Sequence, residues 1–296
     1  MSKDNTVVAA VDGSLASLAA VRWAANTALK RGIPLRLAAS YTMPQFLYAE
    51  GMVPPQELFD DLQAETMEKI ETARAEAQKV APDIEICHTL AEGSPIDMLL
   101  DMSKDVTMIV MGSRGLGGLS GMVMGSVSAA VVSHALCPVV VVREDLDEAY
   151  KYGPVVVGVD GSGISQKAIE YAFAEADARD CELIAVHTWM DMQIQASLAG
   201  LTAAQQQWEV VEQEQHMLLG HRLAGFSEKY PDVKVTKIVT RDRPVRALTD
   251  AALGAQLLVV GSHGRGGFKG MLLGSTSRAL LQSTPCPMMV VRPESK

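Results

Sequence analysis

An internal repeat constrains the fold of this chain more than any other feature of its sequence. The segment VVAAVDGS at 7–14 returns as VVVGVDGS at 155–162, an offset of 148 residues. The segment CPVVVVR at 137–143 returns as CPMMVVR at 286–292, an offset of 149 residues. A period of this length is too long for stacked repeats and indicates a duplicated domain. The 296 residues suit two domains of ordinary size. We therefore predict a first domain at 1–145, a linker at 146–153 and a second domain at 154–296.

Each half shows the same alternation of apolar and helical segments. Apolar, β-branched runs predict strands at 6–11, 35–41, 84–90, 106–111 and 138–142, and at 155–159, 183–189, 233–239, 255–260 and 287–291. Helical patterns lie between these runs, and Pro95 and Pro244 each suit a first helical turn. Strands that alternate with helices predict right-handed crossovers and a parallel sheet, and their apolar character predicts helices on both faces. The predicted fold class is α/β, with two tandem Rossmann-like open-sheet domains of five parallel strands flanked by helices.

Charge and composition exclude several classes of function. The net charge is -9 and the sequence pI is about 5.2, so the basic excess typical of nucleic-acid binding is missing. We find no run of apolar residues long enough to span a membrane and no signal-peptide core, and we expect no membrane partner. The four cysteines show neither CxxC nor metal-ligand spacing, so we expect reduced thiols, no metal site and a cytoplasmic location.

A glycine-rich loop follows the fourth predicted strand of each half. The loops run from Gly112 to Ser126 and from Gly261 to Ser275, and both read G, two residues, G, nine residues, Gly-Ser. Glycines allow a backbone to approach a ligand closely, and a helix that opens at Gly-Ser presents free N–H groups to an anion. Each terminal serine has two open roles, to cap the helix or to donate its hydroxyl to a phosphate. Two copies at a constant offset favour an anion site over a simple connector.

Two better-known phosphate motifs do not fit these loops. A Walker A loop requires lysine after its last glycine, and a dinucleotide fingerprint belongs after the first strand with a different spacing. Asp12 and Asp160, which end the first strand of each half, have two open interpretations. They cap the following helix, or they contact a bound nucleotide with or without that capping.

At these positions the chain resembles the universal stress proteins, and the resemblance covers nearly its whole length. The ATP-binding members of that family carry G-2x-G-9x-G-(S/T) after the fourth strand and an Asp at the end of the first, and both halves match at every one of these positions. The resemblance implies a universal stress protein fold with ATP at the carboxyl ends of the strands. Ligands of open α/β sheets bind at that edge. We therefore expect an ATP-binding, stress-response regulatory protein. Slow or no hydrolysis is expected because no catalytic constellation can be placed near the phosphates, and Mg²⁺ would arrive with the nucleotide because it needs few protein ligands.

The resemblance carries over to individual residues and implies one nucleotide site in each half. In the first half the ligand would contact Ala10, Asp12, Ser40, Gly112, Arg114, Gly115, Gly125, Ser126, Val127 and Ser128. In the second half it would contact Gly158, Asp160, Thr188, Gly261, His263, Gly264, Gly274, Ser275, Thr276 and Ser277. The aspartates are expected beside the ribose, and the loop residues at the ribose and phosphates. Arg114 is always cationic but His263 need not be at pH 7, so the equivalence of the two sites is an open question.

We place no catalytic constellation near the phosphates and therefore predict no catalytic residue. A weak ATPase or a nucleotidyl-transfer enzyme on the same sheet is the alternative. His187 ends the second strand of the second half, where the first half has Ala39, and we interpret it as structural or base-lining. We also expect a homodimer and a signalling partner that the sequence does not identify.

Overall fold

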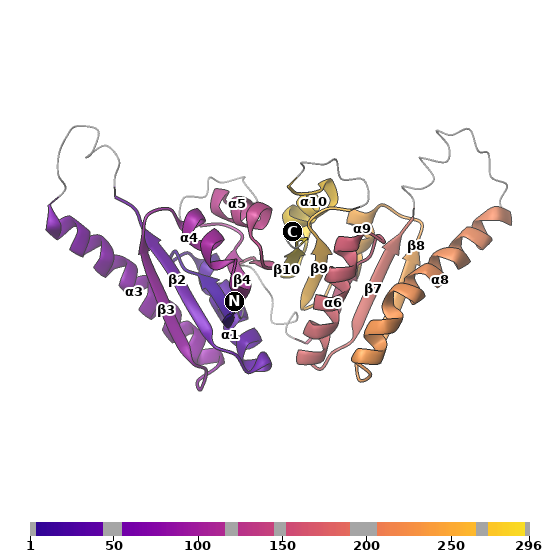
Figure 1. Cartoon of the computed structure of the whole chain (residues 1–296), viewed down its shortest axis with the longest axis horizontal. Coiled ribbons are helices and arrows are strands. Elements are labelled where there is room, and N and C mark those ends of the chain that lie inside the picture. Colours follow the sequence, from indigo (N-terminus) through magenta and orange to yellow (C-terminus); the bar gives the residue numbers. More distant parts are fainter. Residues whose placement is uncertain are drawn as a thin grey trace. The chain divides into compact units, whose positions relative to one another are not determined.

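The chain forms two compact units, Met1–Asp145 and Leu146–Lys296, called domain 1 and domain 2 below. The computed structural model describes residues 4–43, 55–115, 124–144, 152–189, 206–264 and 272–293. Figure 1 shows that each domain combines one sheet with helices packed against it. Each domain is described separately.

The described part of domain 1 contains five parallel strands. They are β1 (Asp4–Ala10), β2 (Leu35–Tyr41), β3 (Ile86–Glu92), β4 (Val106–Gly112) and β5 (Val139–Val142). Their order in the sheet is β3-β2-β1-β4-β5, and every adjacent pair is parallel. The order reverses between β1 and β4, and open α/β sheets bind ligands at such a switch point.

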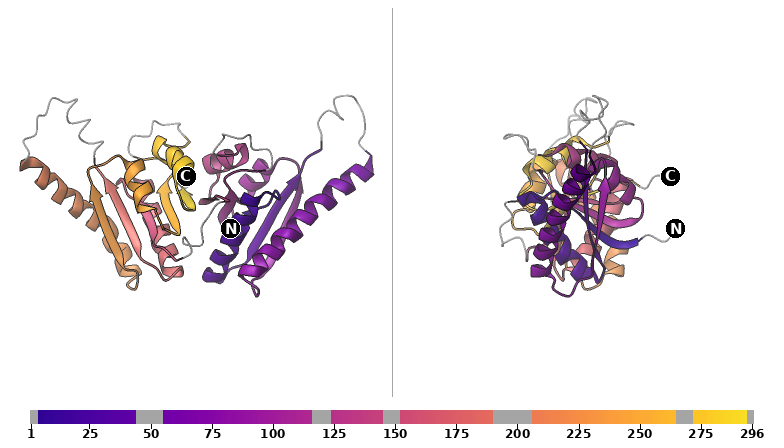
Figure 2. Two further views of the ribbon diagram at one scale, coloured as in Figure 1. Left: turned by 180° about the vertical axis from the view of Figure 1, so that it is seen from behind. Right: turned by 90° about the vertical axis from the view of Figure 1, so that its left-hand side faces the viewer.

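Helices cover both faces of the domain 1 sheet. They are α1 (Leu15–Arg31), α3 (Gln56–Val80), α4 (Pro95–Met102) and α5 (Ser126–His134). The helices α1 and α3 pack together on one face, as the view from behind in Figure 2 shows, and α4 and α5 pack together on the other. Because α1 buries an alanine-rich side, including Ala20, Ala24 and Ala28, it lies close to the sheet.

An ion pair joins the two helices that share a face of domain 1. Arg22 of α1 donates to Glu76 of α3 at 2.8 Å, and Lys79 also bonds to this carboxylate. The bond from Lys79, and then the bond from Arg22, lower the pKa of Glu76. The carboxylate is therefore stabilised in its ionised form in the folded chain.

Domain 2 repeats this architecture. Its strands are β6 (Val155–Gly158), β7 (Leu183–Thr188), β8 (Val235–Thr240), β9 (Leu257–Gly261) and β10 (Met288–Val291). Their order is β8-β7-β6-β9-β10, again parallel throughout. The helices are α6 (Gly163–Ala178), α8 (Gln206–Lys229), α9 (Pro244–Ala251) and α10 (Ser275–Ser283). The predicted α/β class with five parallel strands per domain is confirmed.

The third strand of each domain begins two residues later than predicted. The N–H of Ile84 donates to the carbonyl of Ala81, and that of Val233 donates to the carbonyl of Tyr230, both at 3.3 Å. These turns use the residues that the apolar pattern assigned to the start of the strand. At the other end, pairing between β2 and β3 continues to Glu92.

Domain 2 differs from the described part of domain 1 in two local features. Glu175 and Arg179 form a buried ion pair at 3.0 Å, with side chains 1% and 2% exposed, and Arg179 also donates to Gln256 at 3.2 Å. In addition, Asp180 adopts the left-handed conformation after α6 (φ 49°), where α1 of domain 1 ends at Gly32 (φ 62°).

The four cysteines, Cys87, Cys137, Cys181 and Cys286, form no disulfide bond in the structure. Burial raises the pKa of Cys286 to about 11, so this thiol stays protonated near neutral pH. None of the described helices combines the length and apolar character needed to cross a membrane.

Candidate functional site

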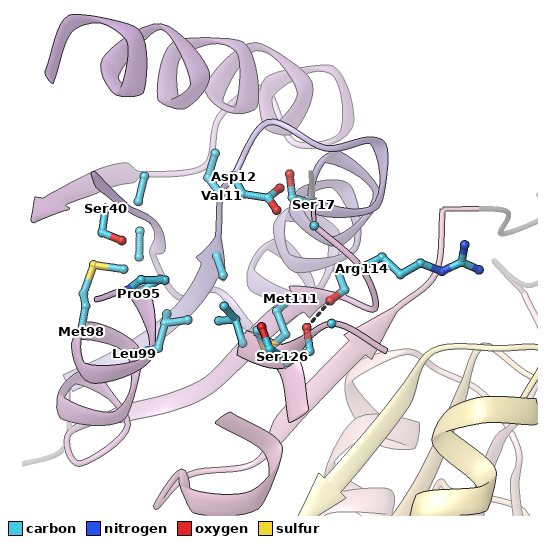
Figure 3. A pocket seen from close by; sticks show the side chains of 18 of the residues that line it. Val11, Asp12, Ser17, Ser40, Pro95, Met98, Leu99, Met111, Arg114 and Ser126 are labelled. Atoms are coloured by element: carbon cyan, nitrogen blue, oxygen red, sulfur yellow. Dashed lines mark hydrogen bonds between the residues drawn. The ribbon is translucent and has the colours of Figure 1, made fainter. Parts of the chain in front are cut away.

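A cavity of about 510 Å³ lies at the carboxyl ends of β1, β2 and β4 in domain 1. Its volume is within the usual range for small-molecule sites, about 300–1,000 Å³. The residues nominated from the sequence in domain 1 all line it: Ala10, Asp12, Ser40, Gly112, Arg114, Gly115, Gly125, Ser126, Val127 and Ser128. The structure therefore gathers them at the sheet's switch point. Figure 3 shows Ser40 and Met98 at one end of the cavity and Ser126 toward the other.

Two helices contribute walls that the sequence analysis did not nominate. Thr66 and Lys69 come from α3, and Pro95, Met98 and Leu99 come from α4. The start of α4 was detectable in principle, because a helix that follows the third strand begins at the same edge of the sheet. Lys69 lies inside a long polar helix and carried no comparable signal.

Of the two open interpretations of Asp12 and Asp160, helix capping is wrong, because the serine two residues later caps each helix. The hydroxyl of Ser14 accepts from the N–H of Ser17 at 3.1 Å. Asp12 instead closes the preceding turn: its Oδ1 accepts from the N–H of Ser14 at 2.9 Å and from its hydroxyl at 2.6 Å. Asp160 accepts from the N–H of Ser162 in the same way, at 2.9 Å. Each carboxylate is therefore held in one orientation at the end of its strand.

The first two loop glycines are explained by packing within the protein rather than by the approach of a ligand. A Cβ at Gly112 would lie 2.8 Å from the carbonyl carbon of Ala16, at the start of α1. A Cβ at Gly115 would overlap Oδ2 of Asp12, and Gly264 has the same relation to Asp160. These glycines therefore let the loop of the fourth strand close against the end of the first.

Gly125 differs from these two positions because a side chain has room there. The nearest atom to an added Cβ would be the N of Gly115, at 3.7 Å, which is an ordinary contact. Gly125 is also the N-cap of α5, and no side chain in the described residues caps this helix. Gly274 is likewise the N-cap of α10. The suggested capping role of Ser126 and Ser275 is therefore wrong, since both occupy the first helical position.

The same bonds close the glycine-rich loop in both domains. The N–H of Gly125 donates to the carbonyl of Ser113 at 2.8 Å, and the N–H of Gly274 to that of Ser262 at 2.7 Å. Ser128 donates its hydroxyl to the carbonyl of Gly112 at 2.8 Å, and Ser277 does the same to Gly261 at 2.7 Å. These hydroxyls are engaged in the fold, which leaves the first-turn N–H groups and Ser126 or Ser275 to face an anion.

The third loop position is Arg114 in domain 1 and His263 in domain 2, and the two side chains have different surroundings. The guanidinium of Arg114 points away from the cavity in Figure 3, so this residue lines the cavity without directing its charge into it. His263 lies with Nδ1 3.0 Å from the hydroxyl of Ser262. The remaining residues nominated in domain 2 occupy the ends of β6 and β7, the loop after β9 and the first turn of α10: Gly158, Asp160, Thr188, Gly261, Gly264, Gly274, Ser275, Thr276 and Ser277.

His187 is only 1% exposed and both of its ring nitrogens have partners. Nδ1 donates to the carbonyl of Val159 at 2.6 Å, and Nε2 lies 3.0 Å from Oε1 of Gln215 on α8. The imidazole thus ties β7 to β6 and to the covering helix, which fits a structural role. No group of three or more potential metal-ligating side chains gathers anywhere in the described ranges.

The model of the universal stress protein family matches residues 5–143 and 151–292. Universal stress protein Rv2005c of Mycobacterium tuberculosis is 40% identical to this chain over 297 residues, covering 98% of each. The solved structure of a universal stress protein from Archaeoglobus fulgidus DSM 4304 covers 98% of both chains with 19% identity and a TM-score of 0.69. A universal stress protein from Archaeoglobus fulgidus in complex with dAMP covers 48% of this chain and 99% of its own, with 25% identity and a TM-score of 0.35. The chain therefore belongs to the universal stress protein family and carries its domain twice.

Proposed function

We propose that the chain is an ATP-binding, stress-response regulatory protein with one nucleotide site in each domain and slow or no hydrolysis. The observation that carries this proposal is the domain 1 cavity. It brings the strand-end carboxylate, the glycine-rich loop and the uncapped start of α5 around a space of about 510 Å³. Such a cavity offers one polar end for phosphates and one apolar end for a nucleoside.

The start of α5 supports the phosphate end. Its first-turn N–H groups lack a side-chain cap, and the helix dipole favours an anion at this position. The dipole alone is worth about 0.3–1 kcal/mol, so several N–H donors must act together. The hydroxyl of Ser126 adds a further donor at the lining of the cavity.

Apolar side chains support the nucleoside end. Pro95, Met98 and Leu99 of α4 line this part of the cavity near Ser40. Removing the faces of a purine from water against such apolar groups is favourable for binding. The carboxylate of Asp12 is a hydrogen-bond acceptor that suits a ribose hydroxyl, and the bonds from Ser14 hold it in place.

The same carboxylate favours binding over chemistry as the main activity. Ser14 donates both its N–H and its hydroxyl to Oδ1 of Asp12, so the carboxylate is held in place as a hydrogen-bond acceptor for a ligand. A weak ATPase or nucleotidyl transferase is the competing function. Mg²⁺ fits without a dedicated protein cage, since it binds mainly to phosphates and waters.

Domain 2 supports the second site through the identical loop bonds at Gly274 and Ser277 and the matching turn at Asp160. The proposal further includes a cytoplasmic location, a homodimer and a signalling partner. Sedimentation of the purified chain tests the homodimer, and only a mass of two chains agrees with it.

Nucleotide carried through a gentle purification tests the proposed function. We expect mass spectrometry to find ATP released from the denatured protein, and we expect phosphate release with added Mg²⁺ and ATP to be slow or undetectable. ADP as the main released species, together with rapid turnover, would support the enzyme instead. A nucleotide-free protein that also fails to bind added ATP would contradict both.

A further inference from the structure

The two domains share the hydrogen bonds that close the glycine-rich loop but differ in residues at other walls of the site. The loop bonds at Gly125 and Gly274 agree to within 0.1 Å, at 2.8 and 2.7 Å. By contrast, several residues that line the domain 1 cavity have different counterparts in domain 2. These include Ala39 and His187 at an offset of 148, and Thr66 and Gln215, Lys69 and Leu218, and Met98 and Ala247 at an offset of 149.

Of these differences, the one between Lys69 and Leu218 has the largest chemical consequence, because Lys69 brings a cation to the cavity wall of domain 1. Its aliphatic stem lies over Gly13: a Cβ at Gly13 would be 3.2 Å from Cγ and 3.4 Å from Cδ of Lys69. Gly13 has φ 87°, a conformation that favours glycine, so the turn leaves room for this stem. Lys69 therefore lies beside the turn that follows Asp12, and both residues line the cavity.

A carboxylate on the same helix positions this ammonium. Nζ of Lys69 bonds to Oε1 of Glu65 at 2.7 Å, one turn earlier on α3. That hydrogen bond and the charge of Lys69 lower the pKa of Glu65. The side chains are 31% and 62% exposed, so the pair is accessible to solvent and its bond is exchangeable.

Domain 2 has an uncharged residue at the position of Lys69. Leu218 replaces Lys69, and the neighbouring Gln215 is engaged with His187 at 3.0 Å. Glu214 occupies the position of Glu65. Of the pair found in domain 1, domain 2 therefore keeps only the carboxylate.

We propose that Lys69 is a specificity-determining residue of the domain 1 site, whose ammonium moves from Glu65 to an oxygen of the ribose or phosphate of a bound nucleotide. This inference rests on the proposed nucleotide sites. Domain 1 then holds an anionic nucleotide more tightly than domain 2, and with a stronger dependence on salt. Domain 2 relies on the loop N–H groups, which it shares with domain 1.

The size of the effect follows from the two bonds of the ammonium. A hydrogen bond to a charged group corresponds to an affinity gain of roughly 10- to 100-fold. The exposed bond to Glu65 that must break corresponds to at most about fivefold. Removing Lys69 should therefore weaken ATP binding by roughly tenfold, and removing Glu65 should tighten it by up to about fivefold.

The test isolates each site in the full-length chain. Gly274→Ser is used to silence domain 2 and Gly125→Ser to silence domain 1, and isothermal titration calorimetry then measures ATP and adenosine binding. In the Gly274→Ser background we expect Lys69→Leu to raise the Kd for ATP about tenfold and that for adenosine much less. Glu65→Gln should lower the Kd for ATP, and it should have no effect once Lys69→Leu is present.

The reciprocal variant Leu218→Lys is a control for misfolding, because it should increase the affinity for ATP rather than reduce it. Leu218→Lys in the Gly125→Ser background should lower the Kd of domain 2 for ATP, and added salt should reduce the effect in both domains. If the parent chains bind ATP but Lys69→Leu and Leu218→Lys leave the Kd unchanged, the proposed role of Lys69 is wrong. The proposed nucleotide sites would not be affected by that result. Parent chains that bind no ATP would overturn the nucleotide sites, and this inference with them.

Discussion

Replacing Gly125 by serine separates the stability of domain 1 from its ability to bind a phosphate. Gly125 is the N-cap of α5, and an added Cβ meets only ordinary contacts, the nearest at 3.7 Å. A serine hydroxyl at an N-cap accepts a hydrogen bond from an N–H of the first turn. The new side chain therefore uses a donor that the proposed site offers to the nucleotide, and it adds atoms at a position that lines the cavity.

The substitution should leave the stability of the ligand-free domain unchanged or slightly higher, while it lowers the affinity for ATP. Serine and glycine differ at an N-cap by only a few tenths of a kcal/mol, in favour of serine, so the ligand-free domain should be unchanged or slightly more stable. Loss of one bond to a charged phosphate costs about 1.5–3 kcal/mol, which raises Kd roughly 10- to 100-fold. At an ATP concentration of a hundred times the original Kd, the stabilisation of domain 1 should fall from about 2.7 to about 0.4 kcal/mol for a hundredfold loss.

Thermal unfolding with and without ATP measures both effects. For a domain of this size, the parent shift should be about 5–10 °C, and the shift of the variant about 1–2 °C. Gly32→Ala is a matched control, because Gly32 lies at the end of α1 and its substitution should leave the ATP shift intact. A full ATP shift in Gly125→Ser, with normal ligand-free melting, would refute the assignment of this helix start to the phosphate.

Five substitutions test the account of the fold. Gly32→Ala should destabilise domain 1 by about 1 kcal/mol through its left-handed φ alone, because the added Cβ meets nothing within 4 Å, and Asp180→Gly should stabilise domain 2 by a similar amount; chemical denaturation measures both. Glu175→Leu alone should cost domain 2 about 3–5 kcal/mol by leaving a buried guanidinium, whereas adding Arg179→Met should recover much of that loss. Glu76→Gln should destabilise domain 1 by at most about 1 kcal/mol, since its partners are partly exposed. Because its folded pKa lies below the ordinary value of 4.5, this loss should be complete above that pH and vanish as the pH falls through the folded pKa; an equal loss at pH 3 and pH 7 would contradict it.

The duplicated fold is predictable from the sequence because its signals are local and occur twice. Apolar runs predict the strands, and Pro95 and Pro244 mark helix starts. The predicted start of each third strand is too early only because it includes residues of the preceding turn. The loop residues were also predictable, since their spacing is preserved at a constant offset.

Side-chain roles that depend on three-dimensional packing were less predictable. Asp-Gly-Ser contains two good capping residues, and only the geometry shows that Ser14 caps the helix while Asp12 closes the turn. The pattern also cannot show that Gly112 is needed against α1 rather than against a ligand. Lys69 was missed because a lysine in a polar helix is ordinarily a solvent-facing residue, and its contact with Gly13 joins distant segments.

Native mass spectrometry of the full-length chain, stripped of nucleotide and titrated with ATP and Mg²⁺, tests the central claim most directly. The account predicts two ATP molecules per chain, with the first bound by domain 1. Gly125→Ser should then remove the tighter site and Gly274→Ser the weaker one. A chain that binds no ATP at millimolar concentration, or that binds it equally when both glycines are replaced, would contradict the proposed nucleotide sites.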